Sequence, residues 1–245
     1  MSALPRFLAD AIDAAGGTAH LPSDEARHLS QVLRLGSGDE IAVFDGAGKE
    51  FRARVDRVFR DGADVRLIEP AVAAPEPSIP IVVAQAALKG DKMDDVIRDA
   101  TMMGAVAIEP LITEHTVAHL VPGGAPERWR RIAVASAKQC GRAIVPRIGR
   151  GRTLGSWLDD DRAELRLILV EPIADASARL AADLAAAPPR SAALLVGPEG
   201  GWSTGEIECA LRAGYVAVTL GRRTLRADAV PIVAMGVMQA IWRDL

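Results

Sequence analysis

Residues 194–206, LLVGPEGGWSTGE, combine an apolar run, a turn rich in glycine and the start of a helix. Because glycine has no Cβ, such a turn can bring main-chain amides and carbonyls close to a ligand. It is not a phosphate loop, since no Gly-Lys-Ser/Thr follows, and its glycine spacing does not fit the dinucleotide fingerprint of many oxidoreductases. Ser203 and Glu206 predict a capping box that fixes the start of the next helix.

A second loop, LGRRTLRAD, follows the apolar run YVAVT at residues 215–219. In an open parallel sheet, ligands bind beyond the carboxyl ends of the strands. Two such loops side by side would form a pocket with mainly main-chain hydrogen bonds, which suits a flat purine better than a triphosphate. On spacing alone, two purely structural turns remain the alternative.

The basic residues are unusual in type and in distribution. Only four of the 29 are lysine, and residues 128–152 contain eight basic residues and no acidic one. Arginine is suited to planar contacts with phosphates and bases, so this stretch predicts a nucleic-acid face. The formal net charge of −3 argues against a general polyanion binder. A solvated helix face followed by an arginine-rich loop is the alternative interpretation.

The bulk composition indicates a globular protein of one or two domains. The 245 residues are 49% hydrophobic, and the mean hydropathy is +0.15. No apolar run reaches the length of about 18 residues that predicts a membrane span, and the first residues show no export signal. Cys140 and Cys209 lie far apart in apolar patterns. We therefore expect free thiols and a cytoplasmic location.

The pattern predicts two domains. Residues 1–70 contain β-rich runs joined at Asp45-Gly46 and Asp61-Gly62, with one helix that Ser23 can cap, which is typical of a small β-barrel. Residues 71–80 contain three prolines and are predicted to be a linker.

From residue 81 onward, strands and helices alternate. They include an amphipathic helix that ends at Gly104, a helix with Pro126 at its start and another helix from Asp175. Such alternation predicts an α/β domain, residues 81–245, with a mostly parallel sheet covered on both faces. Residues 228–245 are apolar almost all round, which predicts either a core helix or, as we favour, a homodimer contact.

Four segments resemble one known family in the same order. VGPEGGWSTGE followed by LGRRTLRADA resembles the C-terminal signature of the RsmE family, within the SPOUT superfamily, whose members methylate N3 of a uridine in 16S ribosomal RNA. RHLSQVLRLGSGDEIAVFDGAGKEF is similar to the family's PUA-like RNA-binding barrel. LKGDKMDDVIRDATMMGAVAIEPLITEHTV and RWRRIAVASAKQCGRAIVPRI are similar to the opening and the central helix of its catalytic domain.

The resemblance implies a C-terminal trefoil knot, a rare exception to the rule that chains stay unknotted. It also implies a homodimer and S-adenosylmethionine bound in a bent form inside the knot. The implied cofactor-binding residues are Val196, Gly197, Gly200, Gly201, Leu220, Gly221 and Leu225.

The implied chemistry requires removal of a proton from uracil N3, by a base or with the help of a cation that stabilises the uridine anion. We assign this catalytic work to Arg226, which stabilises the charge, and Asp228, which orients it or takes the proton. Asp228 could instead only cap the last helix. Arg6, Arg34 and Arg142 are expected to bind the RNA of the small ribosomal subunit.

The sequence departs from the family pattern at several positions. Asp228 replaces a glutamate and is followed by Ala229 rather than threonine, while Met102, Ala135 and Lys138 replace acidic residues. His115 replaces an arginine. With His119 and Glu114 it has the spacing of metal ligands, but a third clear ligand is missing, so we expect a solvated loop and no metal.

Two other functions remain open. A related knotted enzyme could methylate a ribose hydroxyl or a transfer RNA. A non-catalytic RNA-binding factor for ribosome assembly could have lost the cofactor site, which the altered residues at 228 and 229 keep possible.

Overall fold

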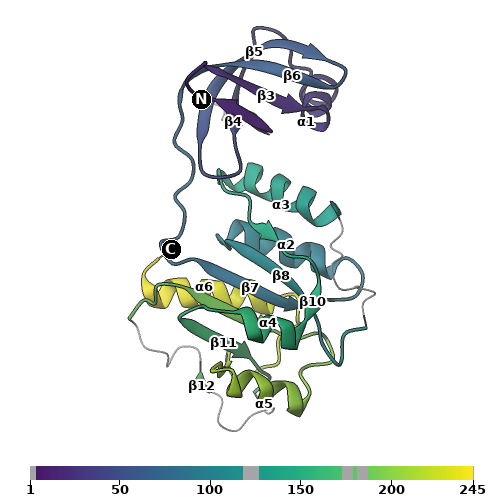
Figure 1. Ribbon diagram of the computed structural model, residues 1–245, viewed down its shortest axis with the longest axis vertical. Coiled ribbons are helices and arrows are strands. Elements are labelled where there is room, and N and C mark those ends of the chain that lie inside the picture. The colour runs from purple at the N-terminus through teal and green to yellow at the C-terminus, as the bar shows by residue number, and fades with distance from the viewer. Residues whose placement is uncertain (1–3, 118–126, 173–178, 181–186, 245) are drawn as a thin grey trace. The chain divides into compact units, whose positions relative to one another are not determined.

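The structure is a computed structural model that describes residues 4–117, 127–172, 179–180 and 187–244 (Figure 1). The chain forms two compact units. The first comprises residues 1–75 with 134–145, and the second comprises 76–133 with 146–245. Residues 134–145 thus belong to the first unit, although the sequence pattern places them in the α/β domain. The predictions for Pro126, His119 and a helix from Asp175 lie outside the described residues.

The first unit is built on a six-stranded sheet in the order β1-β4-β5-β6-β3-β2 (Figure 1). The strands are β1 (Arg6–Leu8), β2 (Ala11–Asp13), β3 (Thr18–Pro22), β4 (Glu40–Phe44), β5 (Glu50–Phe59) and β6 (Gly62–Pro70). All pairs are antiparallel except β1 with β4. Both predicted hairpins are confirmed, and Asp45 fixes the first one, because its Oδ1 accepts hydrogen bonds from the amides of Ala47 and Lys49.

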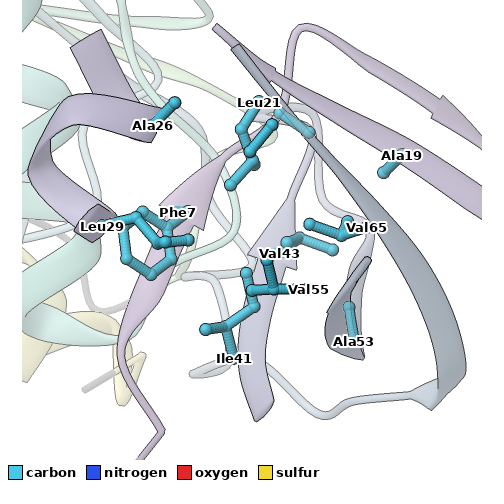
Figure 2. Close-up of a cluster of buried hydrophobic side chains, with 12 residues drawn as sticks. Phe7, Ala19, Leu21, Ala26, Leu29, Ile41, Val43, Ala53, Val55 and Val65 are labelled. Atoms are coloured by element: carbon cyan, nitrogen blue, oxygen red, sulfur yellow. The ribbon is translucent and has the colours of Figure 1, made fainter. Parts of the chain in front are cut away.

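The core of the first unit lies between this sheet and one short helix, α1 (Ser23–Arg27) (Figure 2). Alternate residues of β4 and β5 point inward, among them Ile41, Val43 and Val55. Phe7 from β1 and Leu29 after α1 complete the cluster. The sheet therefore wraps around an apolar plug supplied by the helical segment, as the pattern predicts.

The helical segment differs from the prediction at both ends. Ser23 does not cap it, because Pro22 at the end of β3 occupies the cap position and no side chain accepts there. After α1 the chain forms the π-helical turn η1 (His28–Val32), a wider turn that is often found at functional sites. Arg34 follows with φ of 57°, in the left-handed region that few non-glycine residues adopt.

The second unit contains a parallel sheet in the order β10-β8-β7-β13-β11-β14-β12, with β9 beside β8. The strands are β7 (Ile81–Ala86), β8 (Ala107–Ile112), β9 (Arg147–Ile148), β10 (Arg152–Thr153), β11 (Leu165–Leu169), β12 (Arg179–Leu180), β13 (Ala192–Val196) and β14 (Val216–Thr219). Every pair is parallel. The α/β prediction is therefore confirmed, and the carboxyl ends of β13, β11 and β14 are neighbours.

Helices cover both faces of this sheet (Figure 1). They are α2 (Lys92–Met102), α4 (Leu154–Asp160), α5 (Thr204–Arg212) and α6 (Val230–Trp242), whereas α3 (Glu127–Cys140) contributes residues to both units. On one face α6 contacts α2, β7 and β13, and on the other α4 and α5 contact each other, β8 and β14. None of the helices in the described residues is long and apolar enough to cross a bilayer.

A buried hydrogen-bond chain joins α4 to the second unit's core. Trp157 Nε1 donates to the Tyr215 hydroxyl at 2.8 Å, which in turn donates to Asp161 Oδ2 at 2.6 Å. All three side chains are buried. Burial and the neighbouring Asp161 carboxylate both raise the pKa of Tyr215 above its ordinary value.

Tyr215 makes this chain testable, because it is the only tyrosine of the protein. We expect the folded protein to hold the phenol proton at alkaline pH, whereas the unfolded chain loses it near pH 10. Since the folded pKa is raised, the contribution of Tyr215 to the unfolding free energy should be constant below about pH 10 and fall as pH rises above it. Tyrosinate absorbance of native and urea-unfolded protein measures both effects, and coincident titrations would contradict the expectation.

Candidate active site

Three loops meet beyond the carboxyl ends of β11, β13 and β14. Residues 169–172, 196–202, 219–220 and 223–227, with Lys92 and Val230, line a cavity of about 410 Å³. This volume lies within the range of small-molecule sites, about 300–1,000 Å³. The cavity is at the edge of the sheet that the strand pattern predicts, and it brings together the two loops selected from the sequence.

The order of the elements explains why the loops meet. β14 lies beyond β11, on the side away from β7, whereas α6 contacts β7 and β13. Residues 220–229 connect β14 to α6, so they must cross the carboxyl ends of β11 and β13. This crossing places the second loop beside the glycine-rich turn, residues 197–201.

The glycines of the turn are required for different reasons. A Cβ at Gly197 would lie 3.1 Å from the Trp202 indole nitrogen, and a Cβ at Gly200 would lie 3.0 Å from the Cβ of His115. Gly201 has φ of 69°, which an L side chain adopts only with strain. The turn is therefore packed on two sides, and at its end it has a conformation that a side chain would strain.

A predicted capping box holds the end of the turn. The Glu206 amide donates to Ser203 Oγ at 3.3 Å, and the Ser203 amide donates to Glu206 Oε2 at 3.0 Å. Glu206 Oε1 also accepts from the Glu114 amide at 2.8 Å. The box therefore fixes α5 and ties it to the segment after β8.

Two further side chains hold the turn, and the sequence predicted this contact for neither of them. Gln85 is buried, and its Nε2 donates to the carbonyls of Gly197 at 3.1 Å and Ala86 at 2.9 Å. His115 Nδ1 lies 3.1 Å from the Gly200 carbonyl and 3.2 Å from the Gly201 carbonyl. His115 is exposed, as predicted, but it contacts the turn.

Most charges at the cavity are paired. Lys92 Nζ contacts Glu199 Oε1 at 3.1 Å, and the Lys89 amide donates to the same oxygen. Partial burial acts to raise the pKa of Glu199, but backbone amides and Lys92 together hold it below its ordinary value. Glu199 is therefore ionised, and it joins the glycine-rich turn to the start of α2.

Arg226 and Asp228 form a two-pronged pair, with Nε to Oδ1 at 3.0 Å and Nη2 to Oδ2 at 2.8 Å. The Arg226 side chain is 72% exposed and that of Asp228 only 14%. The alternative in which Asp228 caps the last helix is wrong, because Ala229 is the cap residue of α6 and no side chain accepts there. Asp228 thus acts on Arg226.

Most of the cofactor-binding and catalytic residues selected from the sequence line the cavity, and two do not. Those that line the cavity are Val196, Gly197, Gly200, Gly201, Leu220, Leu225 and Arg226. Gly221 and Asp228 lie in the same loop segment but not among the described lining residues. Residues 169–172 were missed, although the apolar run LRLIL ahead of them marks a third strand end.

The three arginines selected for RNA binding lie in the first unit and differ in exposure. Arg6 pairs with Glu50 through two bonds and donates to the Arg142 carbonyl at 2.9 Å. Arg142 is 3% exposed, whereas Arg34 is exposed. The structure thus brings Arg6 and Arg142 together as buried or half-buried groups, and only Arg34 presents its side chain to solvent.

One family departure has a structural partner. Lys138, which replaces an acidic residue of the family pattern, pairs with the buried Glu25 at 2.7 Å. Among the described residues, no group of three or more histidine, cysteine, aspartate or glutamate side chains could hold a metal ion.

Both units match known protein families. The family model described as an RNA methyltransferase domain matches residues 75–239. A second model, an RNA methyltransferase PUA domain, matches residues 21–68. The cavity and all the loops around it lie within the first of these matches.

Individual relatives agree with these models. The ribosomal RNA small subunit methyltransferase E of Synechocystis is 34% identical over 226 residues, which cover 91% of this chain and 73% of the relative. That of Mycobacterium bovis is 31% identical, covering 96% and 92%. A crystal structure of the Neisseria gonorrhoeae protein of the same name, bound to S-adenosyl methionine, superimposes with a TM-score of 0.87 at 31% identity, covering 98% of each chain.

The strain at Gly201 can be measured against a matched glycine. We expect Gly201→Ala to lower the unfolding free energy by about 1–2 kcal/mol, because alanine pays for the left-handed conformation. Gly205 lies in α5, and a Cβ there would meet no atom within 4 Å. Gly205→Ala should leave stability unchanged or raise it by up to about 1 kcal/mol. Urea denaturation compares the two, and equal losses would contradict the strain.

Proposed function

The chain belongs to the RNA methyltransferase family that includes ribosomal RNA small subunit methyltransferase E, and we propose that it methylates N3 of a uridine in 16S ribosomal RNA with S-adenosylmethionine. The single observation that carries this proposal is the cavity between the glycine-rich turn and residues 219–227. It lies in the segment that matches the RNA methyltransferase domain. A protein with the same fold, 31% identical to this chain, binds S-adenosylmethionine.

The residues of the cavity fit this cofactor. Leu169, Val196, Leu220 and Leu225 offer apolar walls, and the glycine-rich turn offers main-chain polar groups without side chains. Such a surface suits a flat adenosine. Glu171 adds a carboxylate on one wall, which suits the positive charge of the sulfonium. We propose Val196, Gly197, Gly200, Gly201, Leu220, Gly221 and Leu225 as the cofactor-binding residues.

When bound, the cofactor supplies a methyl group that is already activated on a sulfonium sulfur. The work left to the protein is to align that group with the attacking nitrogen. Positioning of this kind can contribute about 7–11 kcal/mol to the lowering of the barrier. The crossing of residues 220–229 supports a positioning role for the protein. It places the loop that carries Arg226 between β14 and α6, beside the ends of the neighbouring strands.

Arg226 is the proposed catalytic residue and Asp228 its positioning residue. Uracil N3 must lose its proton, and a guanidinium beside a uracil carbonyl stabilises the negative charge that develops. Arg226 lines the cavity, while both oxygens of Asp228 are engaged by Arg226. This arrangement favours a role for Asp228 in orienting Arg226 rather than a role as the base that accepts the N3 proton.

The path of the chain supports the proposed trefoil knot. Residues 220–229 leave β14, pass the end of β11 and enter α6, which contacts β13 and β7 near the middle of the sheet. A knot requires that such a segment pass through an earlier loop. The segments at 169–172 and 196–202, which share a cavity with it, are the loops in question.

We also propose that the protein works as a homodimer in the cytoplasm. Residues 230–242 contain no charged side chain, yet Val233 of α6 is 37% exposed and Met102 of α2 equally so. An exposed apolar face of this kind favours association with a second copy. Sedimentation equilibrium at micromolar concentration tests this, and a monomer would contradict it.

Arg226 gives the sharpest test of the chemistry. We expect Arg226→Ala to lower kcat by about 10²–10³, as loss of one charge-stabilising donor does elsewhere, while calorimetry still detects cofactor binding. Arg226→Lys should recover little, because lysine lacks the planar fork that Asp228 holds. Transfer of labelled methyl groups to 16S ribosomal RNA measures both. Wild-type turnover by Arg226→Ala would show that the assignment is wrong.

Arg34 is the proposed RNA contact that the structure leaves exposed. Loss of one phosphate contact lowers the slope of log affinity against log salt by about 0.7–0.9. We therefore expect Arg34→Ala to bind ribosomal RNA more weakly, with that smaller slope. Arg212→Ala is the control, because Arg212 lies on α5 and pairs with Glu208. Equal binding curves for the two variants would contradict the contact.

The function as a whole is tested in cells. A strain without the protein should yield 16S ribosomal RNA that lacks one N3-methyluridine, detected by mass spectrometry of nuclease digests. The wild-type chain should restore it and Arg226→Ala should not. An unchanged digest would contradict the proposed function, and a methyl group lost from a ribose or from transfer RNA would redirect it.

A further inference from the structure

Glu171, whose carboxylate suits the sulfonium charge, stands at a junction of the cavity's walls. It follows β11 at the carboxyl end of that strand and lines the cavity. Its Oε1 lies 3.6 Å from the position that a Cβ on Gly201 would take. The carboxylate therefore sits against the glycine-rich turn, between two of the three loops that form the cavity.

Glu171 differs from the other charged groups there. The second carboxylate that lines the cavity, Glu199, pairs with Lys92. Arg226 pairs with Asp228. Within the described part of the chain, Glu171 forms no hydrogen bond and no ion pair, and the same holds for the guanidinium of Arg223 on the opposite loop.

We propose that Glu171 makes this cavity select the positively charged methyl donor over its neutral product. The inference rests on the proposed function. In the reaction the S–CH3 bond breaks and leaves its electron pair on sulfur, the N3–CH3 bond forms, and the N3 proton leaves to solvent. The ligand of the cavity thus loses one positive charge, while the charge of Glu171 stays.

Coulomb attraction gives the size of the effect. Two opposite unit charges attract each other several-fold more strongly near a protein surface than in bulk water, because the effective dielectric constant there is lower. The charges of Lys92 and Arg226 are largely compensated by their partners, so they weaken this attraction little. Arg223, which lacks such a partner, suits the donor's amino-acid carboxylate, a group that the product keeps. The interaction with Glu171, whose charge no ion pair within the described residues offsets, is therefore the one that methyl transfer changes most.

The consequence for turnover is direct. S-adenosylhomocysteine differs from the donor by one methyl group and one charge. A cavity that binds mainly by shape would therefore bind the donor and this product with similar affinity. A fixed carboxylate adds an attraction to the donor's positive charge, and this attraction is lost when the methyl group is transferred. Glu171 would thus strengthen donor binding and ease product release without contact with the RNA.

Calorimetry with wild-type protein and Glu171→Gln tests the proposal, with S-adenosylmethionine, S-adenosylhomocysteine and sinefungin as ligands. Sinefungin carries an ammonium group in place of the methylated sulfonium, so it keeps the charge. We expect Glu171→Gln to weaken S-adenosylmethionine and sinefungin about tenfold, the equivalent of about 1.4 kcal/mol, and to leave S-adenosylhomocysteine unchanged. Glu208→Gln on α5 is the control for the loss of one surface carboxylate.

The outcomes distinguish charge selection by Glu171 from cofactor binding in the cavity. Equal weakening of all three ligands would overturn the role of Glu171 in charge selection, while the cofactor assignment would stand. Wild-type protein that binds none of them would overturn both. A melting temperature equal to that of wild type shows that Glu171→Gln is folded, and Glu171→Asp should recover part of the preference.

Discussion

Residues 220–229 must cross the carboxyl ends of β11 and β13, because β14 lies beyond β11 while α6 packs on β7 and β13. The rest of the site depends on this constraint. It brings the loop that follows β14 against the glycine-rich turn that follows β13, so one cavity has walls from three strand ends. Without the crossing, the cavity would lack the wall that residues 219–220 and 223–227 supply.

The crossing alone would not give a fixed site, because loops are the most mobile parts of most folds. Here each loop is tied down by named contacts. The buried Gln85 holds the Gly197 carbonyl, and Trp202 Nε1 donates to the Leu169 carbonyl at 3.0 Å. Arg226 is aimed by Asp228. Paired charges hold the walls in place, and Glu171 remains available for a ligand.

The sequence predicted those features that depend on neighbours along the chain. Alternating apolar runs predicted the parallel sheet, and Ser203 with Glu206 predicted the capping box, because both patterns are local. The glycine-rich turn was recognised for the same reason. Even a local prediction failed at Ser23, since Pro22 at the end of β3 takes the cap position and offers no side-chain acceptor.

Features set by distant residues could not be predicted. Arg6 and Arg142 belong to an arginine-rich composition that suggests RNA, but Glu50 and main-chain carbonyls hold Arg6, and Arg142 is buried. His115 reaches the glycine-rich turn from a segment 85 residues away. The sequence did not predict that residues 169–172 form the third wall of the cavity, because no glycine follows that strand. Contacts between residues far apart in the chain decide the roles of these side chains, and a single sequence does not reveal such contacts.

The most direct test of the account is a crystal structure of this protein with S-adenosylmethionine. We expect the adenosine between residues 196–202 and residues 219–225, with the sulfonium on the side of Glu171 and the methyl group open toward Arg226. Cofactor bound elsewhere, with the cavity between these loops empty, would contradict the central claim.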